Sequence, residues 1–443
     1  MKTGDVRFAP LITTATSHDD TLSAGTIGQL NLKLIPFLML LYLIAYIDRS
    51  NISVAALQMN AELGLTTKMY GIGAGLFYVT YVLLEVPSNL ILSHVGARRW
   101  IARIMFSWGL VASGMSLVHT PTQLYIMRLL LGAAEAGFTP GIIYYLSCWY
   151  PRSDRARAMS FFYICATLAS VIGLPLSGLL LKLNGVMGIS GWRWLFLLEG
   201  LPALLLGFVV LGYLPDTPAK APWLSDAQKN WLIGLLRREA DTSPVAHSTA
   251  WQKALRNRKV WMLSLFWFLQ AFGTLGVTLF LPLIVRSVSS QSDLIVTLLS
   301  ALPFLFACVF MYLNGRHSDR SGERALHLGF PMLGAGGLLI AAIYCGNQTL
   351  SYALLVVTIA LNWAATPVFW AVTTEYLSGT AAAVSIALIN AIANICGVGL
   401  PPLMGYIKDT THTYDYALLL VAAALLLGGV LGLYLGGARR KTA

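Results

Sequence analysis

Residues 417–437 have the sequence ALLLVAAALLLGGVLGLYLGG and contain no charged side chain. Residues 350–374 form a second segment without charge. A helix needs about 20 residues to cross the hydrocarbon core of a bilayer, so each segment is long enough to span a membrane. Proline and glycine inside such segments are tolerated because neighbouring helices satisfy the freed backbone groups. These segments therefore predict an integral membrane protein.

The composition of the whole chain supports this prediction. Of the 443 residues, 57% are hydrophobic and 11% are charged, whereas about 25% of the residues in an ordinary soluble domain are charged. Apolar segments recur along the chain and predict an all-α membrane protein with twelve transmembrane helices. The expected spans are residues 32–58, 70–93, 101–119, 121–148, 158–182, 191–214, 259–286, 293–314, 325–346, 349–373, 379–407 and 415–437.

Basic residues determine the predicted orientation. The net charge of +11 is also typical of nucleic-acid-binding proteins, but here the basic clusters follow even-numbered spans, which argues against a nucleic-acid partner. These clusters are Arg98, Arg99 and Arg103; Arg152, Arg155 and Arg157; Arg316, Arg320 and Arg324; and Arg439, Arg440 and Lys441. This positive-inside pattern predicts a multi-pass protein of the cell's inner (plasma) membrane, with both termini and the long middle loop in the cytoplasm.

The two halves of the chain share two signatures at the same spacing. Asn89 and Gly315 begin related motifs 226 residues apart, and the Gly-Leu-Pro motif at residues 173–175 recurs at residues 399–401 with the same offset. This repetition predicts two related six-helix bundles. The predicted organisation is a cytoplasmic tail at residues 1–31, a bundle at 32–214, a cytoplasmic linker with an amphipathic helix at 215–258, a second bundle at 259–437 and a cytoplasmic tail at 438–443.

Four charged residues lie inside predicted spans. Asp48 and Arg49 are in the first span, and Arg128 and Glu135 lie seven positions apart on one helical face of the fourth. A charged side chain at the middle of a membrane costs about 2.5–3.5 kcal/mol. Such residues therefore persist where they pair with one another or line a polar cavity.

Two interpretations of these charges are open. They can be buried salt bridges that only fix the helices, or they can form an anion site in which Arg49 and Arg128 hold a carboxylate while Asp48 and Glu135 carry protons. The second interpretation is favoured because a purely architectural pair would more often occur in both halves. The positions 226 residues after the two arginines hold leucine instead. The planar fork of arginine also suits a carboxylate.

The motifs of this chain resemble those of the major facilitator superfamily. Residues 315–324, GRHSDRSGER, match its loop motif G-x-x-x-D-R-x-G-x-R, whereas Asn89 and Ser93 replace Gly and Asp in the first copy. The segments YIDRSNIS at 46–53, EVPSN at 85–89 and RLLLGAAEAG at 128–137 resemble the anion:cation symporter family, especially its bacterial carriers of tartrate, sugar acids and hydroxyphenylacetate. The resemblance implies substrate and proton roles for the same four charged residues.

Other candidate residues supply polar or aromatic groups. Tyr46, Tyr81, Gln270 and Asn394 are candidates for substrate contacts, with packing between helices as the alternative for the tyrosines and Asn390 as a competitor of Asn394. We expect a gate at the cytoplasmic face, built from Asp319, Arg320 and Arg324 in the second half and from Gly96 and Arg98 in the first.

These features predict a secondary active transporter that couples uptake of a small organic carboxylate to protons by alternating access. A proton-driven exporter and an anion exchanger of the same fold stay open as alternatives, as does a sensor. The sequence has no phosphate loop, metal-ligand cluster or nucleophile elbow, so we expect neither an enzyme nor a cofactor. The expected partners are the organic anion, protons and the lipid bilayer, and the expected oligomeric state is a monomer.

Overall fold

The computed structural model describes residues 15–241, 254–289, 291–377 and 381–437. The predicted C-terminal tail with its basic cluster lies outside these ranges, as do residues 1–14 of the predicted N-terminal tail and residues 242–253 of the linker. The described part of the chain consists of helices and connecting turns and contains no β-strand. The predicted all-α class is therefore confirmed.

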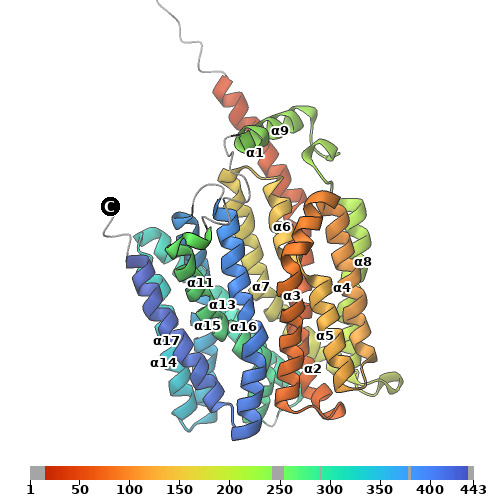
Figure 1. Cartoon of the computed structure of the whole chain (residues 1–443), viewed down its shortest axis with the longest axis vertical. Coiled ribbons are helices and arrows are strands. Elements are labelled where there is room, and N and C mark those ends of the chain that lie inside the picture. Colours follow the sequence, from red (N-terminus) through yellow and green to blue (C-terminus); the bar gives the residue numbers. More distant parts are fainter. Residues whose placement is uncertain (1–14, 242–253, 290, 378–380, 438–443) are drawn as a thin grey trace, which may run out of the picture.

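The helices form two bundles that stand side by side (Figure 1). The first bundle contains α2 (Ile35–Glu62), α3 (Thr67–Val95), α4 (Ala97–Gly114), α5 (Pro121–Glu135), α6 (Phe138–Ser147), α7 (Arg152–Leu181) and α8 (Gly191–Tyr213). The second contains α11 (Arg258–Ala271), α12 (Thr278–Val288), α13 (Asp293–Ser321), α14 (Ala325–Tyr344), α15 (Gln348–Tyr376), α16 (Ala381–Thr411) and α17 (Asp415–Gly437).

Most of the predicted spans are long and apolar enough to cross a membrane. Ten helical segments among the described residues meet both conditions. Two further helices run alongside them: α4, whose first two turns carry three arginines, and α7, whose apolar part is the shorter segment Cys165–Leu181. Together they account for the twelve predicted spans.

Three predicted segments differ from the structure. The fourth span is interrupted between α5 and α6, where Gly137 has a φ of +86° and a Cβ atom would lie 2.3 Å from Ser88 Oγ. The seventh span contains a π-helix, Phe272–Val277, between α11 and α12. The motif at 315–324 was expected in a loop. Residues 315–321 instead extend α13, and Gly322 ends the helix with a φ of +65°.

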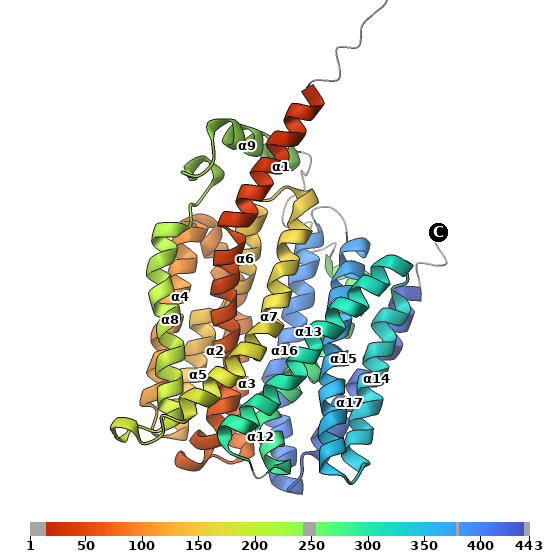
Figure 2. The same ribbon diagram turned by 180° about the vertical axis from the view of Figure 1, so that it is seen from behind.

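Helices α1 (Ala15–Lys33) and α9 (Asp226–Asp241) lie together at one end of the molecule (Figures 1 and 2). Helix α1 was not predicted in this polar segment; it joins α2 almost without a break, since Leu34 N donates to Leu30 O at 2.9 Å. Helix α9 begins at a capping box, in which Ser225 N donates to Gln228 Oε1 at 3.0 Å and Gln228 N donates to Ser225 Oγ at 3.3 Å. We call this end of the molecule the α9 end and the opposite end the far end.

Polar contacts join the two bundles at the far end. Gln58 Nε2 on α2 donates to Asp293 Oδ2 on α13 at 2.8 Å. The backbone N–H groups of Thr67 and Lys68, at the start of α3, donate to the carboxylate of Asp409 on α16 at 3.0 and 2.8 Å. Since these contacts connect helices of different bundles, they hold the far end closed.

The backbones of α3 and α16 approach each other closely beside these polar contacts. A Cβ atom at Gly71 would lie only 2.2 Å from the carbonyl oxygen of Pro401. Only glycine fits such an approach of two backbones, and small residues serve this purpose at helix contacts in membranes. The closed far end therefore depends on Gly71.

Candidate anion and proton site

The structure brings the four charged residues of the first bundle together around one small cavity. The lining residues are Asp48, Arg49, Phe77, Tyr78, Arg128, Leu131, Glu135 and Leu279. Leu279, on α12, is the one contribution from the second bundle. The cavity has a volume of about 10 Å³, which is enough for about one water molecule. The charged cluster is therefore enclosed in this conformation.

Arg49 and Glu135 form an ion pair across the first bundle. Arg49 Nε on α2 donates to Glu135 Oε1 on α5 at 2.5 Å. The Glu135 carboxylate is fully buried, and both Arg49 Nη2 and Glu135 Oε2 are buried without a hydrogen-bond partner. Glu135 is the last residue of α5, directly before the break at Gly137. Broken helices in membranes occur where backbone lines a cavity or is buried in protein.

Arg128 is also buried but is bound differently. Its Nε donates to the backbone carbonyl of Gly73 on α3 at 3.2 Å, and no ion pair of Arg128 occurs among the described residues. Its guanidinium lies over the ring of Phe77, with Cζ 4.9 Å from the ring centroid. A cation in this position, held by a carbonyl and a ring, keeps most of its charge available for an anion.

Asp48 accepts hydrogen bonds on both carboxylate oxygens. Asn51 Nδ2, one helical turn further along α2, donates to Oδ1 at 2.8 Å. Trp108 Nε1, on α4, donates to Oδ2 at 2.7 Å. Neither donor was predicted from the sequence; the spacing of three between Asp48 and Asn51 was a signal for the first, and no signal pointed to Trp108.

Aromatic side chains of α3 surround the Arg49 guanidinium. Its Cζ lies 4.8 Å from the ring centroid of Tyr81, 5.8 Å from that of Phe77 and 5.4 Å from that of Tyr46 on α2. Tyr46 and Tyr81 were predicted at the site. Phe77 and Tyr78 were not, although residues 77, 78 and 81 recur with helical spacing on one face of α3.

Two predicted residues of the second bundle do not line the cavity in this conformation. Gln270 Nε2 instead donates to Asn362 O at 2.8 Å and to Thr366 Oγ1 at 2.9 Å, both on α15. Asn394 on α16 is partly buried, and its competitor Asn390 accepts a hydrogen bond from Trp267 Nε1 at 3.1 Å. Their role at a substrate site stays a prediction.

The predicted gate residues lie near the α9 end. In the second bundle, Arg324 forms ion pairs with Asp319 at 2.7 Å and with Glu375 of α15 at 3.0 Å, whereas Arg320 is exposed. In the first bundle, Gly96 has a φ of +96°, and the Arg98 backbone N–H donates to Asp216 Oδ1 at 3.3 Å. Asp216 lies directly after α8, at the start of the linker.

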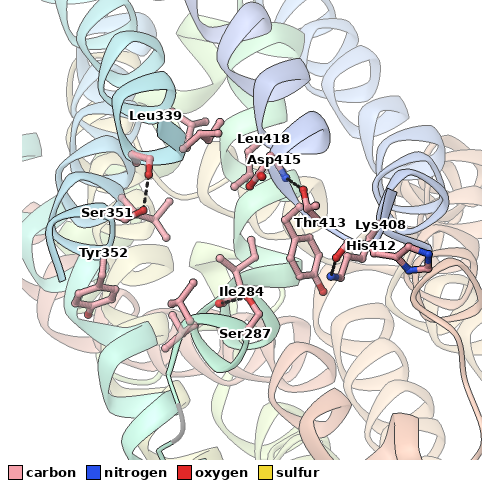
Figure 3. A pocket seen from close by; sticks show the side chains of 16 residues that line it. Ile284, Ser287, Leu339, Ser351, Tyr352, Lys408, His412, Thr413, Asp415 and Leu418 are labelled. Carbon is pink, nitrogen blue, oxygen red and sulfur yellow. Dashed lines mark hydrogen bonds between the residues drawn. The ribbon is translucent and has the colours of Figure 1, made fainter. Parts of the chain in front are cut away.

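A larger cavity, of about 270 Å³, lies in the second bundle at the far end (Figure 3). Two of the polar side chains on its wall are engaged within the protein: Ser351 Oγ donates to Ala342 O, and Lys408 Nζ donates to His412 O. The buried charges are at the smaller cavity, which we therefore treat as the candidate site. Among the described residues, no group of three His, Cys, Asp or Glu side chains is arranged to hold a metal ion.

Comparison with known proteins adds to this picture. The model of the Major Facilitator Superfamily matches residues 38–401. The chain is 42% identical to the "Putative tartrate transporter" of Agrobacterium vitis over 100% of this chain and 98% of that protein. It is 38% identical to the "Quinolone resistance transporter" of Acinetobacter baumannii over 91% of this chain and 93% of that protein. The solved structure of a bacterial homolog of the human lysosomal transporter Spinster is similar in fold, with a TM-score of 0.72 at 18% identity over 91% of this chain and 95% of that one.

Proposed function

Since the chain belongs to the major facilitator superfamily and is a multi-pass membrane transporter rather than an enzyme, we propose that it couples the uptake of a small organic carboxylate to protons. The observation that supports this proposal most is the enclosed Arg49–Glu135 ion pair with Arg128 beside it. Two arginines and two carboxylates in one cavity can exchange partners with an anion and with protons. The proposed location is the cell's inner membrane, with the α9 end in the cytoplasm.

The arrangement of the two arginines supports a carboxylate substrate. Both guanidinium groups lie over the ring of Phe77, with Cζ 5.8 Å from the centroid for Arg49 and 4.9 Å for Arg128. Two neighbouring arginines suit a substrate with two carboxylates or with a carboxylate and hydroxyl groups. Tartrate has both features, and the similarity to the "Putative tartrate transporter" makes it the first substrate to test, followed by sugar acids and hydroxyphenylacetate.

Competition for Arg49 explains how protons and the anion are coupled. While Glu135 is ionised it occupies the Arg49 guanidinium at 2.5 Å, so a substrate carboxylate has to displace it. Protonation of Glu135 removes its charge and frees Arg49 for the substrate. Asp48 lines the same cavity as Arg128 without an ion pair to it, and protonation of Asp48 removes a second negative charge from beside the arginines. Inward movement of one net positive charge gains about 2.3 kcal/mol per 100 mV of membrane potential, so the potential drives two protons with a monoanion inward but adds nothing for two protons with doubly ionised tartrate.

Uptake into proteoliposomes tests the proposal. The purified protein should accumulate labelled tartrate when the external pH is lower than the internal pH, and a protonophore should abolish accumulation. Arg128→Ala should lose at least nine-tenths of the uptake, since removal of one partner of a buried charged contact costs about 2–5 kcal/mol. Arg103→Ala is the control, because Arg103 stacks on Trp100 of the same helix, outside the cluster. Unchanged uptake by Arg128→Ala contradicts the proposed anion site.

Export is the second candidate function. It is favoured by the similarity to the "Quinolone resistance transporter" and opposed by the two buried arginines, which disfavour a cationic cargo. Inverted membrane vesicles distinguish the two directions. Proton-driven accumulation of labelled norfloxacin inside them would support an exporter, whereas tartrate exchange without proton movement would support an anion exchanger.

A further inference from the structure

We propose that His317 and His327 form a binding site for one divalent transition-metal ion such as Zn²⁺. His317 lies in the last turns of α13 and His327 in the first turn of α14, so the site spans the segment that carries the predicted gate residues Asp319 and Arg324. Metal binding here is independent of the proposed function, since neither histidine lines the cavity of the four buried charges.

The two imidazole rings present nitrogen atoms to each other across this segment. His317 Nδ1 and His327 Nε2 are 2.6 Å apart, and the ring centroids are 4.8 Å apart. Imidazole nitrogen is a ligand that suits zinc, copper and nickel ions. Two nitrogens bound to one tetrahedral zinc ion at about 2.0–2.1 Å lie about 3.4 Å from each other. The exposed His317 ring therefore has to move by less than about 1 Å to admit the ion.

Glu323 sets the tautomer that a metal ion requires. Its Oε2 lies 3.2 Å from His327 Nδ1, and the backbone N–H of Leu326 donates to the same oxygen at 2.8 Å. Because a carboxylate only accepts, Nδ1 of the neutral His327 ring carries the hydrogen, and Nε2 keeps its lone pair toward His317. Histidines that bind metals usually donate their other ring N–H to a carboxylate, carbonyl or water in this way, which makes them better ligands.

Backbone contacts hold both histidines in place. Asn314 Nδ2 donates to the carbonyl oxygen of His327 at 2.9 Å and to that of Ala364 on α15 at 2.8 Å. Ser321 Oγ donates to the carbonyl oxygen of His317 at 2.8 Å. The His327 side chain is 11% exposed, whereas His317 is exposed. One ligand is therefore fixed, and the other faces the solvent from which an ion enters.

The charges around the two histidines are compatible with a bound cation. Arg316 Nη1 donates to the Tyr312 hydroxyl at 2.7 Å, and Arg324 forms the two ion pairs described above. Arg320 is exposed, so salt screens its charge. Glu323 places a negative charge beside the pair. Two protein ligands leave the other coordination positions to water, which agrees with the lack of a group of three ligand side chains in the described part of the chain.

Titration calorimetry with Zn²⁺ on the purified full-length protein tests the site. The protein should carry no polyhistidine tag, because a tag binds the same ions. We expect one Zn²⁺ per chain, with affinity at least tenfold lower in His317→Ala and in His327→Ala. His119→Ala is the matched control, since His119 is an exposed histidine between α4 and α5. Unchanged affinity in either His317→Ala or His327→Ala overturns the proposal.

Glu323→Gln tests the carboxylate behind the His327 ring. The amide keeps an oxygen for the backbone N–H of Leu326 but has no charge. Loss of such a supporting group lowers metal affinity about 10- to 100-fold, so we expect a loss of at least tenfold. Asp226→Asn should keep the full affinity, because the Asp226 side chain on α9 is 97% exposed. Full affinity in Glu323→Gln overturns the role of Glu323.

Thermal unfolding shows whether the ion binds both histidines of the folded protein. An ion that binds only the folded state stabilises it, so Zn²⁺ at about 100 times its Kd should raise the melting temperature by several degrees. His317→Ala and His327→Ala should show no rise, and Mg²⁺, which prefers oxygen ligands, should cause none in the wild type. An equal rise in the wild type and both variants overturns the proposal. If His327→Ala does not fold, the exposed His317 decides alone.

Discussion

Arg49 on α2 and Glu135 at the end of α5, 86 positions apart in the sequence, form an ion pair inside the first bundle with 2.5 Å between Nε and Oε1; the Glu135 side chain is fully buried and the Arg49 side chain is 18% exposed. Arg49 Nη2 and Glu135 Oε2 have no hydrogen-bond partner, so each residue keeps one polar atom that a ligand or a proton can satisfy. Removing one partner from a buried pair costs about 3–5 kcal/mol, because the other charge is left uncompensated. The pair is therefore stable only until something else neutralises one of its members.

Glu135→Gln should make anion binding less dependent on pH, with Asp48 as the remaining proton carrier at the site. The neutral amide no longer holds Arg49, so tartrate should bind about tenfold more tightly than to the wild type above neutral pH. Calorimetry on the purified protein measures this, with Glu62→Gln as control, since Glu62 pairs with Arg193 away from the cavity. Uptake driven by a proton gradient should be lost while exchange of labelled for unlabelled tartrate continues. Weaker binding by Glu135→Gln at every pH would contradict the competition for Arg49.

Phe77→Leu should lower the affinity for the anion without unfolding the bundle. The Phe77 ring supports both guanidinium groups, and a cation–π contact contributes about 0.5–2 kcal/mol, so the Kd should rise roughly 2- to 30-fold. Phe106→Leu is the matched control, because Phe106 packs on Phe208 at the outside of the bundle. An affinity equal to that of the control would show that the ring does not position the arginines.

The sequence alone was sufficient to predict the membrane spans and to identify the four charged residues inside them. One physical reason accounts for both. A bilayer penalises both interrupted apolar segments and charged side chains so strongly that either stands out in one sequence. Asp48, Arg49, Arg128 and Glu135 were recognisable for this reason. The hydrogen-bond partners of Arg49 and Arg128 could not be predicted from the sequence, because two arginines and two carboxylates allow several pairings.

The less predictable parts depend on close packing of ordinary residues. Asn51, Phe77 and Trp108 are unremarkable in a membrane helix until the fold places them beside a charge. The break after Glu135 was missed because an apolar sequence continues through Gly137. Gln270 is bonded to α15 in this conformation, and the sequence does not tell which conformation brings a residue to a site.

Gly71→Ala should prevent complete closure of the far end. The added Cβ would lie 2.2 Å from the Pro401 carbonyl oxygen, so α3 and α16 would have to separate. We expect uptake of tartrate to fall at least tenfold, and a cysteine introduced at Gln58 to react faster with a polar maleimide added from the far end. Gly337→Ala is the matched control, since a Cβ there meets nothing within 4 Å. Equal labelling rates in the two variants would contradict this account of closure.

Arg324→Ala should destabilise the second bundle more than Asp319→Asn does. Partial burial opposes the charge of Arg324, but hydrogen bonds to Asp319 and Glu375 raise its pKa above the usual value, so Arg324 stays charged at every working pH. The Asp319 side chain is 69% exposed, and an exposed pair contributes about 0–1 kcal/mol. Arg324→Ala also loses the ion pair with Glu375, which joins the residue before α14 to the end of α15. The melting temperature in detergent should therefore fall by several degrees in Arg324→Ala and by less in Asp319→Asn. The affinity for tartrate should be unchanged in both variants. Equal melting temperatures would mean that the pair with Glu375 does not hold these helices together.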